Sequence, residues 1–359
     1  MAQQGLEIDF LPVGNGDRAG DAIVLRYGDL FGPRQAQQVV VVDGGFAETA
    51  ESVVELVRDR YQTNVVDLVV STHPDADHSA GLAVVLDELV VGELWMHLPW
   101  LHTFDIARMF QDGRVTDASV SAALRRDLED ARALEAIARR KGIRVFEPFT
   151  GLSDGGGLVV LGPDKGYYEG LLPHFRATPA PKTALDALFE RLADATSSVF
   201  ETLSLETLTD DGDTSAENNS SVILLLSWAD QQVVLTGDAG APALTRALDA
   251  LDAGAPGFRN LTCVQVPHHG SRRNVGPTLL SRLLGPPGAM HQRRPAAMVS
   301  APTTPTAKHP SKRVTNAFHR RGAPVHATCG TSILHAHNAP QRIGYGPVAP
   351  IPFHASFAE

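Results

Sequence analysis

The chain has 359 residues, of which 43% are hydrophobic and 20% are charged, and this composition excludes a disordered or fibrous protein. Its formal net charge of −10 argues against a broad basic surface for nucleic acid. A phosphate-containing substrate is not excluded, because bound divalent cations would dominate the field at an active site.

Neither a membrane span nor an export signal is expected from the sequence. It contains no run of about 18 apolar residues, and its start, MAQQGLEIDFLPVG, lacks the segments of a signal peptide. Its two cysteines, Cys263 and Cys329, are too few for a disulfide framework and lie in no CxxC pair. We therefore expect a soluble, cytoplasmic protein with no membrane partner and with reduced thiols. Cys263 lies in an apolar strand and should be buried.

Residues 1–45 predict an opening sheet, because they contain the strand patterns LEIDFLPV, AIVLRYG and QVVVVDGG, each closed by Gly or Asp. Helical spacing from Glu51 to Tyr61 is followed by the buried strand VVDLVVSTH and the helix SAGLAVVLDEL. The segment from Phe104 to Lys141 is helical and highly charged, and we expect it to cover one face of the sheet.

The second half repeats this pattern. SVILLLSW and QQVVLTGD read as paired strands, ALTRALDAL as a helix, and LTCVQVPHHGS as a strand that ends in polar residues. In open α/β sheets ligands bind outside the carboxyl ends of the strands. Three of these strands end there in side chains that can bind metals.

Residues 166–218 depart from the pattern and predict an inserted helical arm. Its apolar positions Leu185, Leu188, Phe189 and Leu192 recur at helical spacing, and the acidic tail TDDGDTSAEN is flexible in composition. We interpret the arm as a lid that restricts access to the active site. A contact of a homodimer, or an extension of the core, is the alternative.

The densest cluster of candidate metal ligands is His73, Asp75, Asp77 and His78, which lie within six residues at the end of a strand. A tight loop projects alternate side chains into one concavity, so His73 and Asp75 can bind one cation while Asp77 and His78 bind a second. The alternative, an exposed polar turn, is disfavoured by the buried strand before the loop and the helix after it.

This segment resembles the HxHxDH signature of the metallo-β-lactamase superfamily, with Asp75 in place of the second His. The HxDxDH form resembles the soluble domain of the competence protein ComEC and its standalone relatives. The likeness extends over FLPVGNGD, VVDGG, NNSSVILLL, VVLTGD and VPHHGS. It implies an α/β protein in which residues 1–359 form a single αββα sandwich, with the 166–218 arm inserted in it.

The resemblance also implies roles for residues outside the first cluster. Asp43 of VVDGG corresponds to an Asp that orients a ligand, and Asp238 of TGD to the carboxylate that bridges both metals. His269 is favoured as the last ligand, with His268 hydrogen-bonded to substrate or to a neighbouring ligand. His309 of AKHPS is an alternative ligand or a phosphate contact, and its structural role stays open.

The resemblance leaves one ligand of the first metal unassigned. His97, His102 and His174 are the nearby options, but a lone His beside Trp or Phe is more often a packed core residue. Two divalent cations are implied. The carboxylates among these ligands shift the metal preference of the site toward Mn²⁺ or Mg²⁺, while the histidines are also compatible with Zn²⁺.

We expect a metal-dependent hydrolase that uses a metal-bridged hydroxide, with Asp77 or Asp75 orienting it and His268 or His269 acting as general acid. The resemblance implies a phosphodiesterase or nuclease with a phosphodiester or nucleic-acid substrate. The alternatives are a zinc hydrolase of a β-lactam, lactone or thioester, and a catalytically silent binding module. Side chains beside the site that could contact phosphate are Ser271, Arg272, Arg273, Lys308, Lys312 and Arg313.

Overall fold

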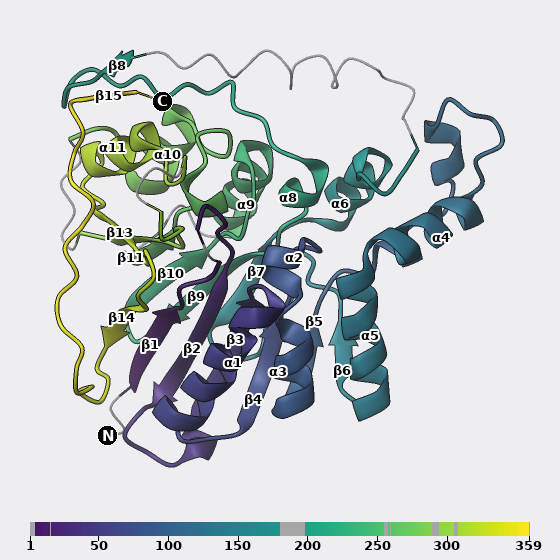
Figure 1. Cartoon of the computed structure of the whole chain (residues 1–359), viewed down its shortest axis with the longest axis horizontal. Helices are drawn as coiled ribbons and strands as arrows, with labels where there is room; N and C mark the ends of the chain where they lie inside the picture. Colours follow the sequence, from purple (N-terminus) through teal and green to yellow (C-terminus); the bar gives the residue numbers. More distant parts are fainter. Residues whose placement is uncertain are drawn as a thin grey trace.

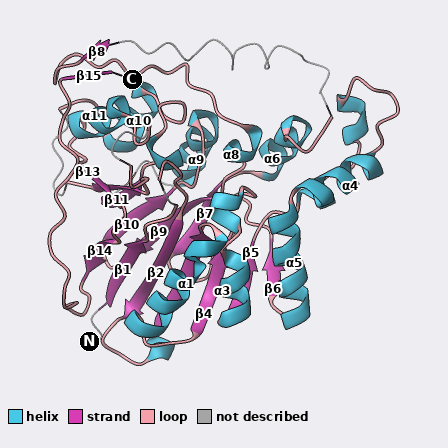
Figure 2. Cartoon of the chain, viewed as in Figure 1, coloured by secondary structure: helices cyan, strands magenta, loops and turns pink. Residues whose placement is uncertain are grey.

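A computed structural model describes residues 4–14, 16–179, 198–254, 258, 260–288, 294–304 and 308–358. These residues form two sheets packed face to face, with helices on both outer faces (Figures 1 and 2). The expected αββα sandwich is therefore the observed architecture. In the described part of the chain, no helix is both long enough and apolar enough to span a membrane.

The first sheet has seven strands and is parallel from β3 to β6. Its order is β14 (Ile333–His337), β1 (Gln4–Phe10), β2 (Ala22–Asp29), β3 (Gln37–Gly44), β4 (Val65–Val70), β5 (Val90–Trp95) and β6 (Arg144–Phe146).

The second sheet has six strands and is parallel from β10 to β13. Its order is β13 (Val325–Ala327), β12 (Ala296–Val299), β11 (Leu261–Gln265), β10 (Gln231–Leu235), β9 (Ile223–Trp228) and β7 (Leu158–Gly162). A separate pair is formed by β8 (Ser198–Phe200) and β15 (Ser356–Ala358).

Helices cover each sheet on its outer face, as Figure 1 shows. The first sheet carries α1 (Ala50–Glu55), α3 (Leu82–Glu88) and α5 (Glu129–Lys141), and the second carries α9 (Ala241–Gly254), α10 (Pro277–Leu284) and α11 (Lys312–Arg320). The other helices are α2 (Ala76–Ser79), α4 (Asp117–Asp127), α6 (Lys165–Leu171) and α8 (Ala216–Asn219). Single turns of tighter or wider helix lie at Arg34–Ala36, Ala47–Thr49, Leu56–Arg60, Pro99–Leu101, Ile106–Met109, Leu172–His174 and His268–Gly270.

Strand β3 shows why the sheets are buried on both faces. Successive side chains of a strand point to opposite faces. Val39 and Val41 pack under the outer helices, whereas Val40 and Val42 pack in the layer between the two sheets. An uninterrupted VVVV run therefore places apolar side chains in both layers, as expected of a strand covered on both sides.

The strands expected at both ends of the chain are confirmed, as is the burial of Cys263. The expected helix at 51–61 is α1, extended by a wider turn at Leu56–Arg60. The prediction for Phe104 to Lys141 is wrong in its first third: continuous α-helix begins at Asp117, where Thr116 caps α4, and α5 follows from Glu129.

In the 166–218 segment the structure describes residues 166–179 and 198–218, which include α6, the helical turn Leu172–His174, β8 and α8. Leu185, Leu188, Phe189 and Leu192 lie outside the described residues. Its acidic tail is not the flexible linker that its composition predicted. Asp210 accepts hydrogen bonds from the backbone N and Oγ1 of Thr278, at 3.0 and 2.6 Å. Ser215 caps α8 by accepting a bond from the backbone N of Asn218. Composition missed the bonds of Asp210 because Thr278 is distant in sequence.

Candidate metal centre

The site lies where the carboxyl ends of parallel strands from both sheets meet. Asp43 is the next-to-last residue of β3 and His73 follows β4 in the first sheet, while Asp238 follows β10 and His268 follows β11 in the second. All but His268 are buried. The sandwich thus brings residues from four separate strand ends to one edge.

The loop after β4 leads directly into α2. Asp75 is the N-cap residue of α2, but its side chain makes no capping hydrogen bond, and Asp77 and His78 lie in the first turn. Asp77 is partly exposed, whereas His73 and His78 are buried. At this short helix the side chains of Asp75 and Asp77 are therefore partly exposed to solvent, whereas the imidazole of His78 faces the interior.

Asp238 is the centre of the cluster. Its Oδ1 lies 3.3 Å from Nε2 of His78, and its Oδ2 lies 3.9 Å from Nε2 of His73 and 3.4 Å from Nε2 of His268. Each carboxylate oxygen thus faces a different set of histidines. This is the arrangement expected of a carboxylate that bridges two cations.

Hydrogen bonds on the far side of the rings fix a proton on Nδ1, so Nε2 is the nitrogen that can bind a cation. Nδ1 of His78 lies 2.7 Å from Oδ2 of Asp43, a carboxylate that can only accept, so Nδ1 carries the proton. Oγ1 of Thr72 donates to the same oxygen at 2.6 Å and is therefore left to accept from Nδ1 of His73 at 3.1 Å. In both rings Nε2 is left free to bind a cation.

Asn274 has the same effect on His268. Its Nδ2 donates to the backbone carbonyl of Asp238 at 2.8 Å, which orients the amide so that Oδ1 faces Nδ1 of His268 at 2.9 Å. Nδ2 of Asn218, which donates to Oγ1 of Thr214 at 2.8 Å, lies farther from this Nδ1, at 3.2 Å. We therefore assign the proton to Nδ1 of His268, and its Nε2 joins those of His73 and His78.

The residues fit a metal centre because the converging atoms lack other partners. Among the described residues, Nε2 of His73, Nε2 of His78, Oδ1 of Asp238 and both ring nitrogens of His269 are buried without a hydrogen bond. Burying such atoms unsatisfied is costly. Nitrogen and oxygen donors that face one another at 3.3–3.9 Å leave room for a cation between them.

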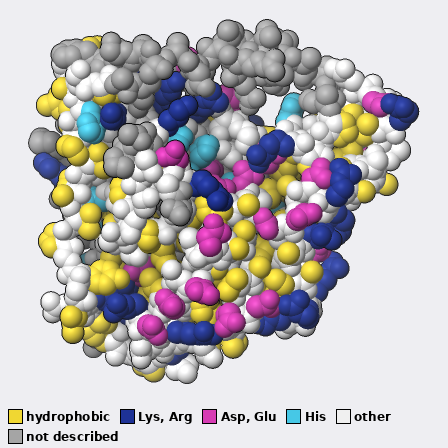
Figure 3. Space-filling model, in the orientation of Figure 1, with side chains coloured by type: hydrophobic (Ala, Val, Ile, Leu, Met, Phe, Trp, Pro, Cys, Tyr) yellow, Lys and Arg dark blue, Asp and Glu magenta, His cyan; other side chains and the backbone are white. Residues whose placement is uncertain are grey.

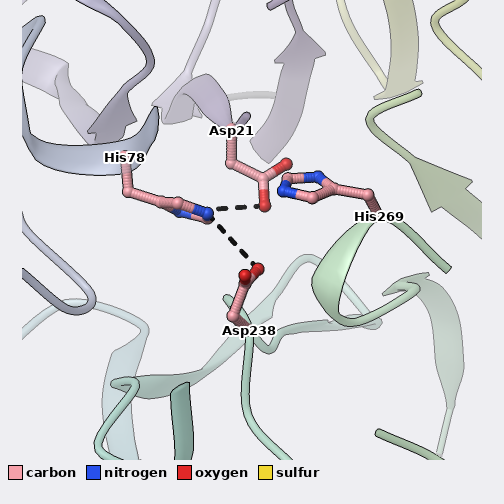
Figure 4. A group of neighbouring side chains, drawn as sticks. All are labelled: Asp21, His78, Asp238 and His269. Atoms are coloured by element: carbon pink, nitrogen blue, oxygen red, sulfur yellow. Dashed lines mark ion pairs between the residues drawn. The ribbon is translucent and has the colours of Figure 1, made fainter. Parts of the chain in front are cut away.

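A second group of candidate ligands includes a residue that the sequence analysis missed. Oδ2 of Asp77 lies 3.6 Å from Nε2 of His269 and 3.9 Å from Nε2 of His78. Figure 4 shows that Asp21 joins His78, Asp238 and His269 there. Asp21 precedes β2, and the antiparallel pairing of Ala22 with Gly44 carries the start of β2 to the same edge as the end of β3. The available signal was the Gly-Asp pair before the AIVLRYG strand.

Charges in the cluster control its protonation. Burial alone would raise the pKa of the Asp238 carboxyl, but His268 and His78 outweigh it and hold the pKa well below its usual range. Burial likewise lowers the pKa of His78, but Asp238 and Asp43 raise it well above 6.5. While no cation is bound, these charges favour a proton on Nε2 of His78, and a cation that binds this nitrogen must displace the proton.

Asp75 connects the cluster to an arginine. Its Oδ2 lies 3.9 Å from Nε2 of His73, and its Oδ1 is paired with Nη2 of Arg176. Glu217, which is buried, accepts from Nε and from the backbone N of Arg176 at 3.2 and 2.6 Å. Arg176 was not among the residues expected from the sequence, since it lies a hundred and one positions from Asp75.

The three other histidines considered for the first metal do not reach the cluster. His97 stacks on Tyr168 with ring centroids 4.3 Å apart, and burial lowers its pKa to about 3. His102 lies between Glu147 and Glu169, and His174 is exposed. Among the described residues it is His268 that approaches Asp238 from this side, with its Nε2 3.4 Å from Oδ2.

His309 and Ser271 lie behind the ligands. The ring of His309 stacks on His268 with centroids 6.1 Å apart, and burial together with His268 lowers its pKa to about 4. Ser271 is buried and its Oγ accepts from the backbone N of Arg273 at 3.3 Å. Ser271 supports the turn at 268–270. Nδ1 of His309 is buried without a hydrogen bond among the described residues, and its role as a ligand or phosphate contact stays a prediction.

An open cleft of about 800 Å³ leads to the cluster. The segment at residues 207–215 forms one wall of the cleft. The cleft is also lined by four arginines, Arg176, Arg272, Arg273 and Arg313. In Figure 3 basic, acidic and histidine side chains gather in the region between α2 and α8. The cleft therefore offers positive groups beside a cluster of carboxylates and imidazoles.

The chain belongs to the metallo-beta-lactamase superfamily, whose family model matches residues 30–290. The fold is that of this superfamily, most of whose members are metal-dependent hydrolases. A search of curated proteins finds no match.

Similar solved structures include three at low identity. One is a diphosphatase of the PhnP family, with 9% identity over 92% of this chain and 98% of that one and a TM-score of 0.38. Another is unliganded yeast PDE1, with 11% identity over 90% and 96% and a TM-score of 0.42. The third is MEM-A1, a subclass B3 metallo-beta-lactamase from a soil metagenome library, with 12% identity over 77% and 86% and a TM-score of 0.29. At these values none of them indicates a substrate for this chain.

Proposed function

We propose that the protein is a metal-dependent phosphodiesterase with two divalent cations bridged by Asp238. The substrate class rests on one observation. Arg176 is paired with Asp75 of the loop at residues 73–78, which we call the metal loop, and it lines the same cleft as Asp238. A guanidinium beside two cations favours an anionic ester over a neutral lactone or thioester.

The donor atoms divide into two sets around Asp238. His73, Asp75 and His268 would hold one cation on its Oδ2 side, and Asp77, His78 and His269 the other on its Oδ1 side. When bound, such a pair lowers the pKa of a coordinated water and stabilises charge on the attacked phosphate.

The remaining groups orient these ligands and bind substrate. Asp43 and Asn274 hold Nδ1 of His78 and His268 protonated, so that Nε2 of each ring is available to a cation. With Nδ1 of His268 engaged in this way, the ring is better suited to bind metal than to act as general acid. Arg176 can donate to the non-bridging phosphate oxygens, and the leaving group departs through the open cleft.

A nuclease of the ComEC type is the narrower form of this proposal. It is supported by the HxDxDH loop and by the further arginines of the cleft, Arg272, Arg273 and Arg313. The wall at 207–215 would limit access to small diesters or single strands, which is the role expected of a lid. Assays on duplex and single-stranded DNA of equal length show whether the cleft excludes duplex: an enzyme restricted in this way cleaves only the single strand.

The test is metal analysis of the purified protein, followed by assays on bis-p-nitrophenyl phosphate, plasmid DNA, a lactone and nitrocefin. We expect diester hydrolysis that a chelator abolishes and that Mn²⁺ or Zn²⁺ restores. Asp238→Ala should lose activity and metal while remaining folded, and Asp17→Asn, an exposed change, should lose neither. Turnover of nitrocefin or the lactone alone would contradict the phosphodiesterase proposal, and two bound ions with no hydrolysis of any substrate would indicate a binding module.

A further inference from the structure

Asp21 is held against the metal loop by its own backbone. Its N donates to the carbonyl of Asp77 at 3.1 Å, and its carbonyl accepts from the N of Gly45 at 2.8 Å. A Cβ on the preceding residue, Gly20, would lie 2.2 Å from the same carbonyl of Asp77, so only glycine permits this approach. The carboxylate of Asp21 is thus carried to the cluster by contacts that no local pattern predicts.

Gln265 orients the carboxylate and uses only one of its oxygens. Its Oε1 accepts from the backbone N of Thr236 and of Gly237 at 2.8 and 3.1 Å, which turns its Nε2 toward Oδ2 of Asp21 at 2.8 Å. Oδ1 of Asp21 is buried and has no hydrogen bond among the described residues. An oriented carboxylate therefore keeps one oxygen unsatisfied in the interior.

The carboxylate of Asp21 belongs to a compact group of candidate ligands, and its Oδ2 lies 4.0 Å from Nδ1 of His78. Asp21, His78, Asp238 and His269 each offer a ligand atom, and these atoms all lie within 4.8 Å of one another. Figure 4 shows the carboxylate of Asp21 between the rings of His78 and His269 and across from Asp238. All four residues are buried, and both nitrogens of His269 lack a hydrogen bond within the described chain.

We infer that Asp21 is a ligand of the second cation, which makes that site rich in carboxylates and favours Mn²⁺ over a softer ion. Asp21, Asp77 and Asp238 would supply oxygens, and His78 and His269 nitrogens. Oxygen donors suit Mn²⁺, whereas the histidine-rich first site suits Zn²⁺ better. This inference deepens the proposed function, since it assumes that the cluster binds metal, but it does not depend on the substrate.

The first test measures metal binding rather than activity. Asp21→Asn keeps the shape of the side chain and removes its charge, and Asp17→Asn is the matched control in the same loop, where Asp17 is exposed. We expect Asp21→Asn to weaken binding of the second Mn²⁺ by about 10- to 100-fold or more while the first ion still binds. Calorimetry and electron paramagnetic resonance count the bound ions. Two ions bound with wild-type affinity would overturn the inference.

The second test distinguishes a ligand from a neighbour of the ligands. In Asp21→Cys loaded with Co²⁺, a thiolate bound to the metal gives a charge-transfer absorption band. The band is expected in this variant and absent from wild type and from Asp17→Cys. An Asp21→Cys protein that binds two cobalt ions without the band would refute direct ligation. Absence of diester hydrolysis by the metal-loaded wild-type protein would instead count against the proposed function.

Discussion

Replacing Asp43 by Asn tests whether protonation of His78 on Nδ1 is what allows metal binding. The backbone should tolerate the change, because Asp43 has a φ of 57° and Asn is among the residues that adopt this left-handed region. The backbone N of Thr72 donates to Oδ1 of Asp43 at 2.8 Å, so the amide oxygen of Asn must occupy that position. Its NH₂ group then replaces Oδ2.

The new NH₂ group would face Nδ1 of His78, which lies 2.7 Å from Oδ2 in the native protein. Two donors cannot face each other at that distance, so the proton of His78 moves to Nε2. Nε2 is 3.3 Å from Oδ1 of Asp238, and the proton would occupy the position of the cation. Losing such an orienting carboxylate weakens metal binding by about 10- to 100-fold. This corresponds to about 1.4 to 2.7 kcal/mol.

Calorimetric titration of metal-free Asp43→Asn with Mn²⁺ and with Zn²⁺ measures the effect. Thermal unfolding without metal shows whether the fold is retained, and Asp17→Asn controls for a lost surface charge. Wild-type affinity for both ions in a folded Asp43→Asn protein would refute the argument from the protonation of His78.

Three further predictions follow from the same geometry. Arg176→Met should raise KM for bis-p-nitrophenyl phosphate by about 10-fold or more, because a charge-assisted hydrogen bond to the substrate is lost. The control Arg140→Met, at an exposed arginine, should leave KM unchanged. Equal KM values in the two variants would show that Arg176 does not bind the substrate. Asp75→His should shift the preference of the first site toward Zn²⁺ in a competition with Mn²⁺, and an unchanged preference would place Asp75 outside the ligand set. Burial lowers the pKa of His97 to about 3 from 6.5, so below pH 6.5 the unfolded chain gains a proton that the folded protein excludes, and stability falls as pH falls. By pH 5 this residue costs about 2 kcal/mol, which urea unfolding at pH 7 and pH 5 should show in wild type and not in His97→Phe; equal pH dependence would contradict it.

The layers of the fold and the metal loop could be predicted from the sequence because their signals are local. The VVVV run of β3 and the strand VVDLVV reflect burial on both faces, and each is followed at once by polar residues. His73, Asp75, Asp77 and His78 are close together in the chain, so a single turn is enough to bring them together. The family resemblance added Asp43 and Asp238 through motifs of the same local kind.

Only the tertiary structure decided which other residues join the cluster. Asp21, Arg176 and Asn274 lie in unrelated segments, and their roles depend on hydrogen bonds to partners far away in sequence. The same holds for the protonated nitrogen of His268, which depends on how a distant amide is oriented. A pattern of neighbouring residues records which face of a strand or helix is buried. It does not record which strand ends meet at an edge, because that depends on how the two sheets pack.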